Sequence, residues 1–161
     1  MNGTRLQTVF CDDIREEVGN KRSLMGIYQG EMFIQILPVL LPRLCFYISY
    51  VSDFSKPHEK VEFKVVKGAD EEELFSTGVI DAGRPVTNEN NLGVPYLNST
   101  ITLAFGMSPF MIDSETVIRI VALSGAEKVL GPCLRVRLAD NQIAKKPVAI
   151  KKPKIKPTKV K

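Results

Sequence analysis

The sequence predicts an all-β protein: an antiparallel β-sandwich of immunoglobulin-like architecture, with about eight strands and a disordered C-terminal tail. Apolar and polar residues alternate with a period of two in short runs, which is typical of strands that have one solvent-facing side. Glycine and proline lie in most connections between these runs. A barrel is the alternative way to close such strands. The lack of tryptophan argues against a true antibody-type domain.

Length and charge divide the chain into a domain and a tail. The 161 residues suffice for one domain, and 44% apolar with 25% charged residues is an ordinary globular composition. We expect the folded domain to occupy residues 1–144 and a flexible tail to occupy residues 145–161. Eight of the 22 basic residues and none of the 18 acidic residues lie in the tail, so the domain carries a net charge of −4. The basic character of the chain belongs to its tail.

Each expected strand rests on alternation or on a high content of β-branched and aromatic residues. In chain order the expected strands are residues 5–11, 23–29, 31–36, 44–51, 61–65, 74–80, 101–105, 115–123 and 134–138. Gly19 and Asn20 supply a turn between the first two. Residues 31–36 either continue the second strand beyond Gly30 or form a strand of their own.

The connections between these strands differ in character. Residues 68–73 are polar and join two strands as a hairpin, whereas residues 12–19 are short and acidic and suit a helical turn. The fifteen residues 81–95 exceed the usual length of about 4 to 6 for a connection. Residues 106–113 are unusually apolar for a loop.

The last two expected strands differ in their protection against pairing with another chain. Residues 134–138 carry Arg135 and Arg137 on one face, which is typical of a guarded edge. The interior of residues 115–123 holds a single arginine among β-branched residues, so we expect this strand to have neighbours on both sides. The amides of residues 117–121 should then be among the slowest in the protein to exchange hydrogen.

The thiols and the single histidine indicate no catalytic or zinc site. Cys11, Cys45 and Cys133 lack the spacing of zinc ligands, and free thiols are expected. Negative charge beside Cys11 raises its pKa and makes it a poor nucleophile. His58 lies in a polar connection, where a solvated histidine is the common case. Phosphate-binding loops and hydrolase motifs are lacking, so the sequence predicts a protein that is not an enzyme and has no cofactor.

Asp12 and Asp13 form the carboxylate pair that could serve a divalent cation. Adjacent residues of a strand point to opposite faces, which places the two carboxylates poorly for one ion. The favoured alternative is that Asp13 hydrogen-bonds nearby backbone at a turn while Arg15 pairs with a neighbouring acid.

One segment carries a family resemblance. Residues 11–17 read Cys-Asp-Asp-Ile-Arg-Glu-Glu, and residues 21–28 read Lys-Arg-Ser-Leu-Met-Gly-Ile-Tyr. They resemble the opening signature, Cys-Asp-Asp-Ile-Arg-x-Glu followed by Lys-x-Ser-Leu-x-Gly-x-Tyr, of an uncharacterised family of small bacterial and phage-associated proteins. The resemblance covers about the first fifty residues. It implies a compact, β-rich, intracellular protein, often carried by phages or mobile elements, and implies no activity.

The sequence favours an interaction module that binds a protein partner through its loops. Phe110, Met111 and Ile112 are the candidate anchor if they are exposed; if they are buried, they close one end of the sandwich. The alternative is sequence-independent nucleic-acid binding by the tail lysines. These are Lys145, Lys146, Lys151, Lys152, Lys154, Lys156, Lys159 and Lys161. No apolar run is long enough to span a membrane, and a cytoplasmic location is the default expectation.

Overall fold

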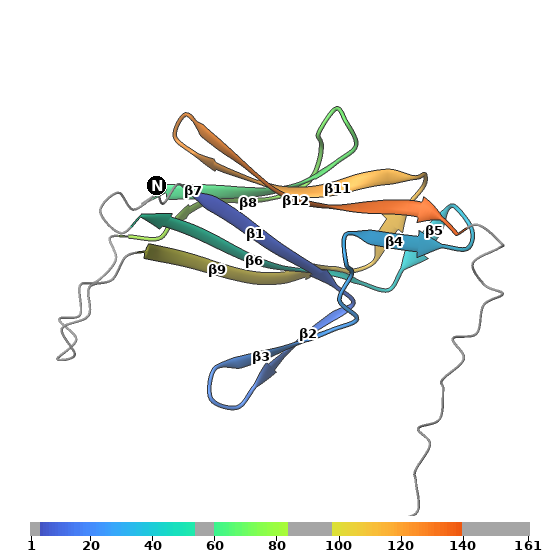
Figure 1. The fold of residues 1–161 in the computed structure, drawn as a ribbon, viewed down its shortest axis with the longest axis horizontal. Coiled ribbons are helices and arrows are strands. Elements are labelled where there is room, and N and C mark those ends of the chain that lie inside the picture. Colours follow the sequence, from blue (N-terminus) through green and yellow to red (C-terminus); the bar gives the residue numbers. More distant parts are fainter. Residues whose placement is uncertain (1–3, 54–59, 84–97, 140–161) are drawn as a thin grey trace, which may run out of the picture.

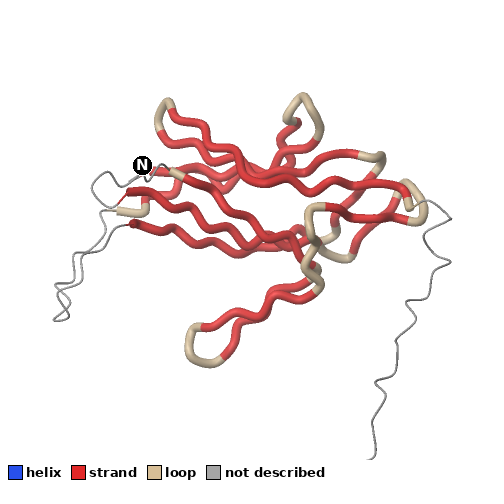
Figure 2. Tube along the Cα trace, in the orientation of Figure 1, coloured by secondary structure: helices blue, strands red, loops and turns tan. Residues whose placement is uncertain are grey.

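The computed structural model describes residues 4–53, 60–83 and 98–139, and this part of the chain is all-β, as predicted (Figure 1). It contains twelve strands and no helix, and Figure 2 shows the strands joined by short turns. The described residues therefore include no helix that could cross a membrane. The basic tail, the boundary expected at residue 144, His58 and most of residues 81–95 lie outside the described residues.

The larger sheet has five strands in the order β4-β12-β11-β7-β8. Their bounds are β4 (Glu31–Ile34), β7 (Lys60–Lys67), β8 (Glu72–Asp81), β11 (Thr116–Ser124) and β12 (Glu127–Leu138). β7 and β8 form the predicted hairpin, and β11 and β12 form a second one. β11 lies between β7 and β12, which confirms that this weakly charged strand has neighbours on both sides.

The prediction of purely antiparallel sheets is wrong at one position, because β4 pairs with β12 in parallel. Arg135 lies opposite Glu31, and Arg137 lies opposite Phe33. Residues 135–138 are therefore covered by a neighbouring strand and do not form the guarded edge that the sequence suggested. Alternation assigns side chains to faces, but it does not identify which distant strand lies alongside.

The smaller of the two main sheets has three antiparallel strands, β1 (Arg5–Cys11), β6 (Leu44–Asp53) and β9 (Asn98–Met107), with β6 in the centre. The register sets Arg5 opposite Val51 at one end of the β1–β6 pair and Cys11 opposite Cys45 at the other. β6 is buried along most of its length, as expected for a central strand.

The apolar faces of the two main sheets share one core, and Figure 1 shows the sheets as two layers. The largest fully buried side chains come from both sheets: Phe46 and Tyr50 from β6, and Phe63 from β7. The rings of Tyr50 and Phe63 meet edge to face across the layers, with their centroids 5.8 Å apart. Burial of this apolar surface supplies the main stabilisation of the domain.

Two short two-stranded sheets complete the fold. The first is a hairpin of β2 (Asp13–Glu17) and β3 (Lys21–Met25), which projects from the two main sheets (Figure 1). The second, which we call the ribbon, pairs β5 (Val39–Leu41) with β10 (Phe110–Ile112) and packs on the core of the main sheets.

Both short sheets correct the sequence predictions. Residues 12–19, expected to hold a helical turn, contain strand β2, although the turn predicted at Gly19 and Asn20 is present. Residues 106–113, expected to be a loop, contain β10. No residue of the two hairpin strands is buried, so burial does not impose the alternation that marks a half-buried strand.

Candidate functional site

The ribbon places the predicted anchor residues on its two faces. Phe110 and Ile112 are 4% and 1% exposed and belong to the core, so these two residues close one end of the domain. Met111 between them is 58% exposed. Because side chains alternate along a strand, Phe110 and Ile112 point into the core while Met111 points to solvent. Of the three predicted anchor residues, only Met111 can contact a partner.

The outer face of the ribbon is apolar. Met111 lies directly opposite Leu40 of β5, so their side chains share the face that points away from the core. Leu40 is 54% exposed. We call Leu40 and Met111 the ribbon patch. Ile36, on the segment that leads to β5, is also exposed. Leu40 was not among the residues predicted from the sequence, because its place beside Met111 follows from the β5–β10 register and not from a local pattern.

The signature residues form the base of the projecting hairpin. The Asp12 amide donates to the Met25 carbonyl, and the Tyr28 amide donates to the Phe10 carbonyl. The Tyr28 hydroxyl donates to the Asp12 carboxylate. Burial raises the pKa of Tyr28, and this hydrogen bond raises it further. Gly26 has φ +66°, and a Cβ atom there would lie 2.0 Å from Asp12 Oδ2. The signature thus has a structural explanation: it fixes the point where the hairpin leaves the body.

Asp13 is held by two arginines. Arg15 Nε donates to one carboxylate oxygen over 3.3 Å, and Arg43 donates to the other over 3.1 Å. The hydrogen bond from Arg15 is the largest cause that lowers the pKa of Asp13. The prediction that Arg15 pairs with a neighbouring acid is therefore confirmed.

The metal-site alternative gains no support from the arrangement of acids and thiols. Within residues 4–53, 60–83 and 98–139, no three His, Cys, Asp or Glu side chains gather as metal ligands would. Asp12 accepts the hydrogen bond of Tyr28, and Asp13 is paired with two guanidinium groups. The expectation that the protein has no cofactor remains a prediction.

Cys11 and Cys45 lie opposite each other and are buried free thiols at the base of the hairpin. Burial raises the pKa of Cys11 to about 11, with smaller contributions from Cys45 and from the two neighbouring aspartates. Burial also raises the pKa of Cys45, whose thiol donates to the Asp12 carbonyl oxygen over 3.5 Å. At neutral pH both groups are protonated, and a protonated thiol is a weak nucleophile.

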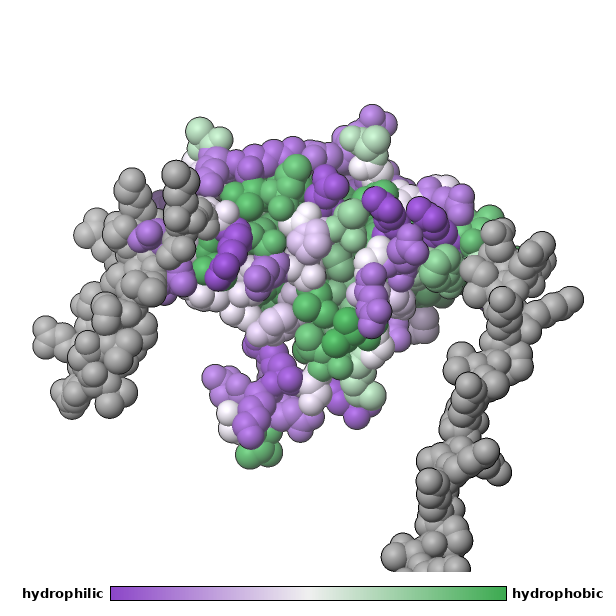
Figure 3. All heavy atoms as spheres, viewed as in Figure 1, coloured by the Kyte–Doolittle hydropathy of each residue, from purple (hydrophilic) through white to green (hydrophobic). Residues whose placement is uncertain are grey.

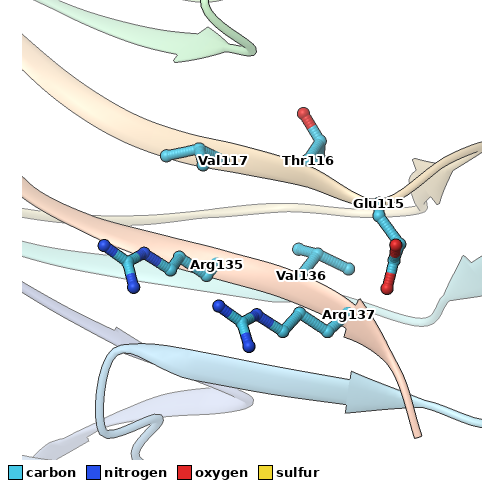
Figure 4. Close-up of a pocket in the computed structure, with 6 residues that line it drawn as sticks. All are labelled: Glu115, Thr116, Val117, Arg135, Val136 and Arg137. Atoms are coloured by element: carbon cyan, nitrogen blue, oxygen red, sulfur yellow. The ribbon is translucent and has the colours of Figure 1, made fainter.

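A basic hollow lies on the outer face of the five-stranded sheet, where Arg135 and Arg137 extend from β12 in the same direction (Figure 4). Its volume is about 510 Å³, and Glu115 and Val117 also line it. The Arg137 guanidinium is 3.6 Å from a Glu31 carboxylate oxygen, whereas Arg135 has no acidic partner among the described residues. The sequence predicted the cationic face of β12 but not its neighbours, because they come from distant strands.

The surface of the molecule distinguishes the hairpin from the body. Figure 3 shows hydrophilic residues over most of the hairpin and hydrophobic residues gathered near its base. Val18 in its turn is 96% exposed. A second hollow, of about 470 Å³, lies between the hairpin residues Asn20, Arg22 and Leu24 and the sheet residues Tyr47 and Thr102.

No protein-family model, curated protein or solved structure matches the chain. These comparisons therefore do not test the resemblance in residues 11–28, which remains a prediction.

Proposed function

We propose that this protein is a non-enzymatic interaction module and that it binds a protein partner through the ribbon patch, Leu40 and Met111. One observation carries the proposal: more than half of each side chain is exposed, on an element whose opposite face is buried in the core. Exposed apolar side chains that share one face on a rigid support are typical of a contact surface. The core side of the ribbon provides that support.

Two further features of the protein belong to the same proposal. We propose that the two main sheets form an immunoglobulin-like sandwich, supported by the core that they share. The resemblance in residues 11–28 supports an intracellular protein associated with phages or mobile elements. The long connection of residues 81–95, which could add to the contact surface, lies mostly outside the described residues.

Site-specific photo-crosslinking in the native cell tests the proposal directly. A photoreactive residue at position 111 or 40 should give a covalent adduct with the same protein. Position 70, in the exposed turn between β7 and β8, is the matched control and should give no such adduct. Adducts that are equally abundant at all three positions, or the lack of any adduct at 40 and 111, would exclude the ribbon patch as the contact.

A charge substitution provides the second test. Met111→Lys places a charge on the ribbon patch without disturbing the core, because Met111 is 58% exposed. We expect an unchanged Tm and loss of the adduct at position 40. Persistence of that adduct in the Met111→Lys variant would contradict the proposed contact.

A further inference from the structure

The outer face of β4, β12 and β11 combines arginine with an exposed aromatic ring. Phe33 lies opposite Arg137 in the parallel β4–β12 pair and is 52% exposed. Arg135 lies opposite Val117 of β11, and Arg119 is two residues further along the same face of β11. We call Phe33, Arg119, Arg135 and Arg137 the arginine face.

The charges of this face are only partly compensated, by Glu31 and by Glu115, which lines the same hollow. Glu31 lies near Arg137 at 3.6 Å, but neither Arg119 nor Arg135 has an acidic partner among the described residues. The Arg119 Nε atom is buried and lacks a hydrogen-bond partner within the same residues. A buried N–H group without a partner is costly, and a ligand that accepts from it would remove that cost. Arg135 and Arg137 are exposed, so their guanidinium groups are accessible to an anion. Three arginines on one face contrast with the net charge of −4 for residues 1–144.

From these contacts we infer that the arginine face is a binding site for single-stranded nucleic acid. Guanidinium groups bind phosphate through paired N–H donors, and Arg135 and Arg137 repeat along β12 at about 6.8 Å, a spacing that suits successive phosphates of an extended strand. The exposed ring of Phe33 lies directly beside Arg137 and offers a platform on which an unpaired base can stack. A duplex does not present its bases in this way, so the site favours single strands.

The sequence after β12 agrees with this ligand. β12 ends at Leu138, and Lys145 is the first of eight tail lysines, so the tail begins within about 25 Å of the arginine face. The tail supplies charge alone, because it contains neither arginine nor an aromatic residue. The folded face adds stacking and paired hydrogen bonds, which lysine does not provide. Nucleic-acid binding, which the sequence assigned to the tail lysines alone, would thus also involve the folded domain. This site is separate from the ribbon patch and does not depend on it.

Fluorescence anisotropy of the full chain with a labelled oligothymidylate tests this inference. The double variant Arg135→Gln/Arg137→Gln should weaken binding about tenfold or more at fixed salt. If two phosphate contacts are lost, the slope of log affinity against log salt should fall by about 1.4. The matched control Arg5→Gln/Lys21→Gln removes the same charge from exposed positions elsewhere and should leave the slope unchanged.

The aromatic contribution separates the folded site from simple attraction between charges. Phe33→Ala should weaken binding about tenfold while leaving the salt slope unchanged, because stacking releases no counterions. Phe33→Tyr should restore the affinity, which distinguishes lost stacking from lost folding. A tail variant with all eight lysines changed to Gln should bind more weakly yet retain its dependence on Phe33 and on the two arginines.

Three results would overturn the inference. The first is wild-type affinity in both the arginine double variant and Phe33→Ala, since the tail would then account for all binding. The second is equal affinity for duplex and single-stranded probes. The third is binding of polyglutamate in place of the oligothymidylate, with the same dependence on Arg135 and Arg137, which would assign the face to an acidic protein segment.

Discussion

The ribbon and the hairpin are both two-stranded sheets, yet they are held to the body in different ways. The ribbon has three residues in each strand and inserts Phe110 and Ile112 into the core. The hairpin has five residues in each strand and buries none of them. An isolated pair of strands is only marginally stable in water. The comparison shows that the shorter element is the integral one, because its side chains are part of the core.

The hairpin depends instead on its base and on weak surface contacts. Arg22 pairs with Glu16 at 3.7 Å, and the Ser23 hydroxyl donates to Glu17 at 2.9 Å. Contacts of this kind at an exposed surface contribute little to stability. The base, where Asp12 fits against Gly26 and accepts the Tyr28 hydroxyl, is therefore the place where the hairpin is fixed to the body.

The largest expected effect is on the ribbon. Phe110→Ala should lower the free energy of unfolding by about 3–5 kcal/mol, because it removes a buried aromatic side chain and leaves a cavity. Met111→Ala on the exposed face should lower it by less than about 1 kcal/mol. Urea unfolding of both variants measures the difference. Similar values for the two would show that the ribbon does not close the core.

A smaller effect is expected at the base of the hairpin. Gly26→Ala introduces a Cβ atom 2.0 Å from Asp12 Oδ2 at φ +66°, and we expect a loss of about 1–3 kcal/mol. Gly19→Ala at the tip is the control, since it has a similar positive φ but no atom within 4 Å of the new Cβ. The difference between the two variants isolates the close contact with Asp12. Equal losses would assign the whole effect to backbone strain.

The two regions also show what could be predicted from the sequence. The strands of the main sheets were predicted because one face of each packs on the core, and this packing imposes alternation such as that of Phe46, Ile48 and Tyr50. The prediction was incomplete for β12, whose first half, residues 127–133, was missed. The hairpin strand β2 was mistaken for a helical turn because none of its residues is buried, so burial imposes no such alternation on it.

The candidate surfaces were less predictable than the strands. The sequence identified Met111, Arg135 and Arg137 as residues of interest, but it did not show that Leu40 faces the first or that Phe33 lies beside the last. Both facts depend on pairing between segments about seventy and one hundred residues apart. The local sequence pattern does not specify which distant segments pair.

The smallest expected effect is the acid sensitivity of the hairpin base. The hydrogen bond from Arg15 is the main cause that lowers the pKa of Asp13 below its ordinary value of 3.8. Desolvation opposes it with a smaller effect, and the Ile14 amide and Arg43 lower the pKa further. A depressed pKa in the folded state means that the stabilisation is complete above pH 3.8 and is lost as the pH falls through the folded-state value. Asp13→Asn should therefore be less stable than the wild type at pH 7, and the difference should vanish in acid.

Thermal unfolding of Asp13→Asn and of the wild type between pH 7 and pH 2 measures this effect, which surface exposure keeps small. Arg15→Gln removes the main partner of Asp13 and should reduce the pH dependence of the stability. Phe110→Ala is the control: it should lower the stability at every pH and leave the stability difference caused by Asp13→Asn unchanged. A wild-type pH profile in the Arg15→Gln variant would show that Arg43 alone holds the carboxylate. The acid response would then report the link between the hairpin base and β6, because Arg43 immediately precedes that strand.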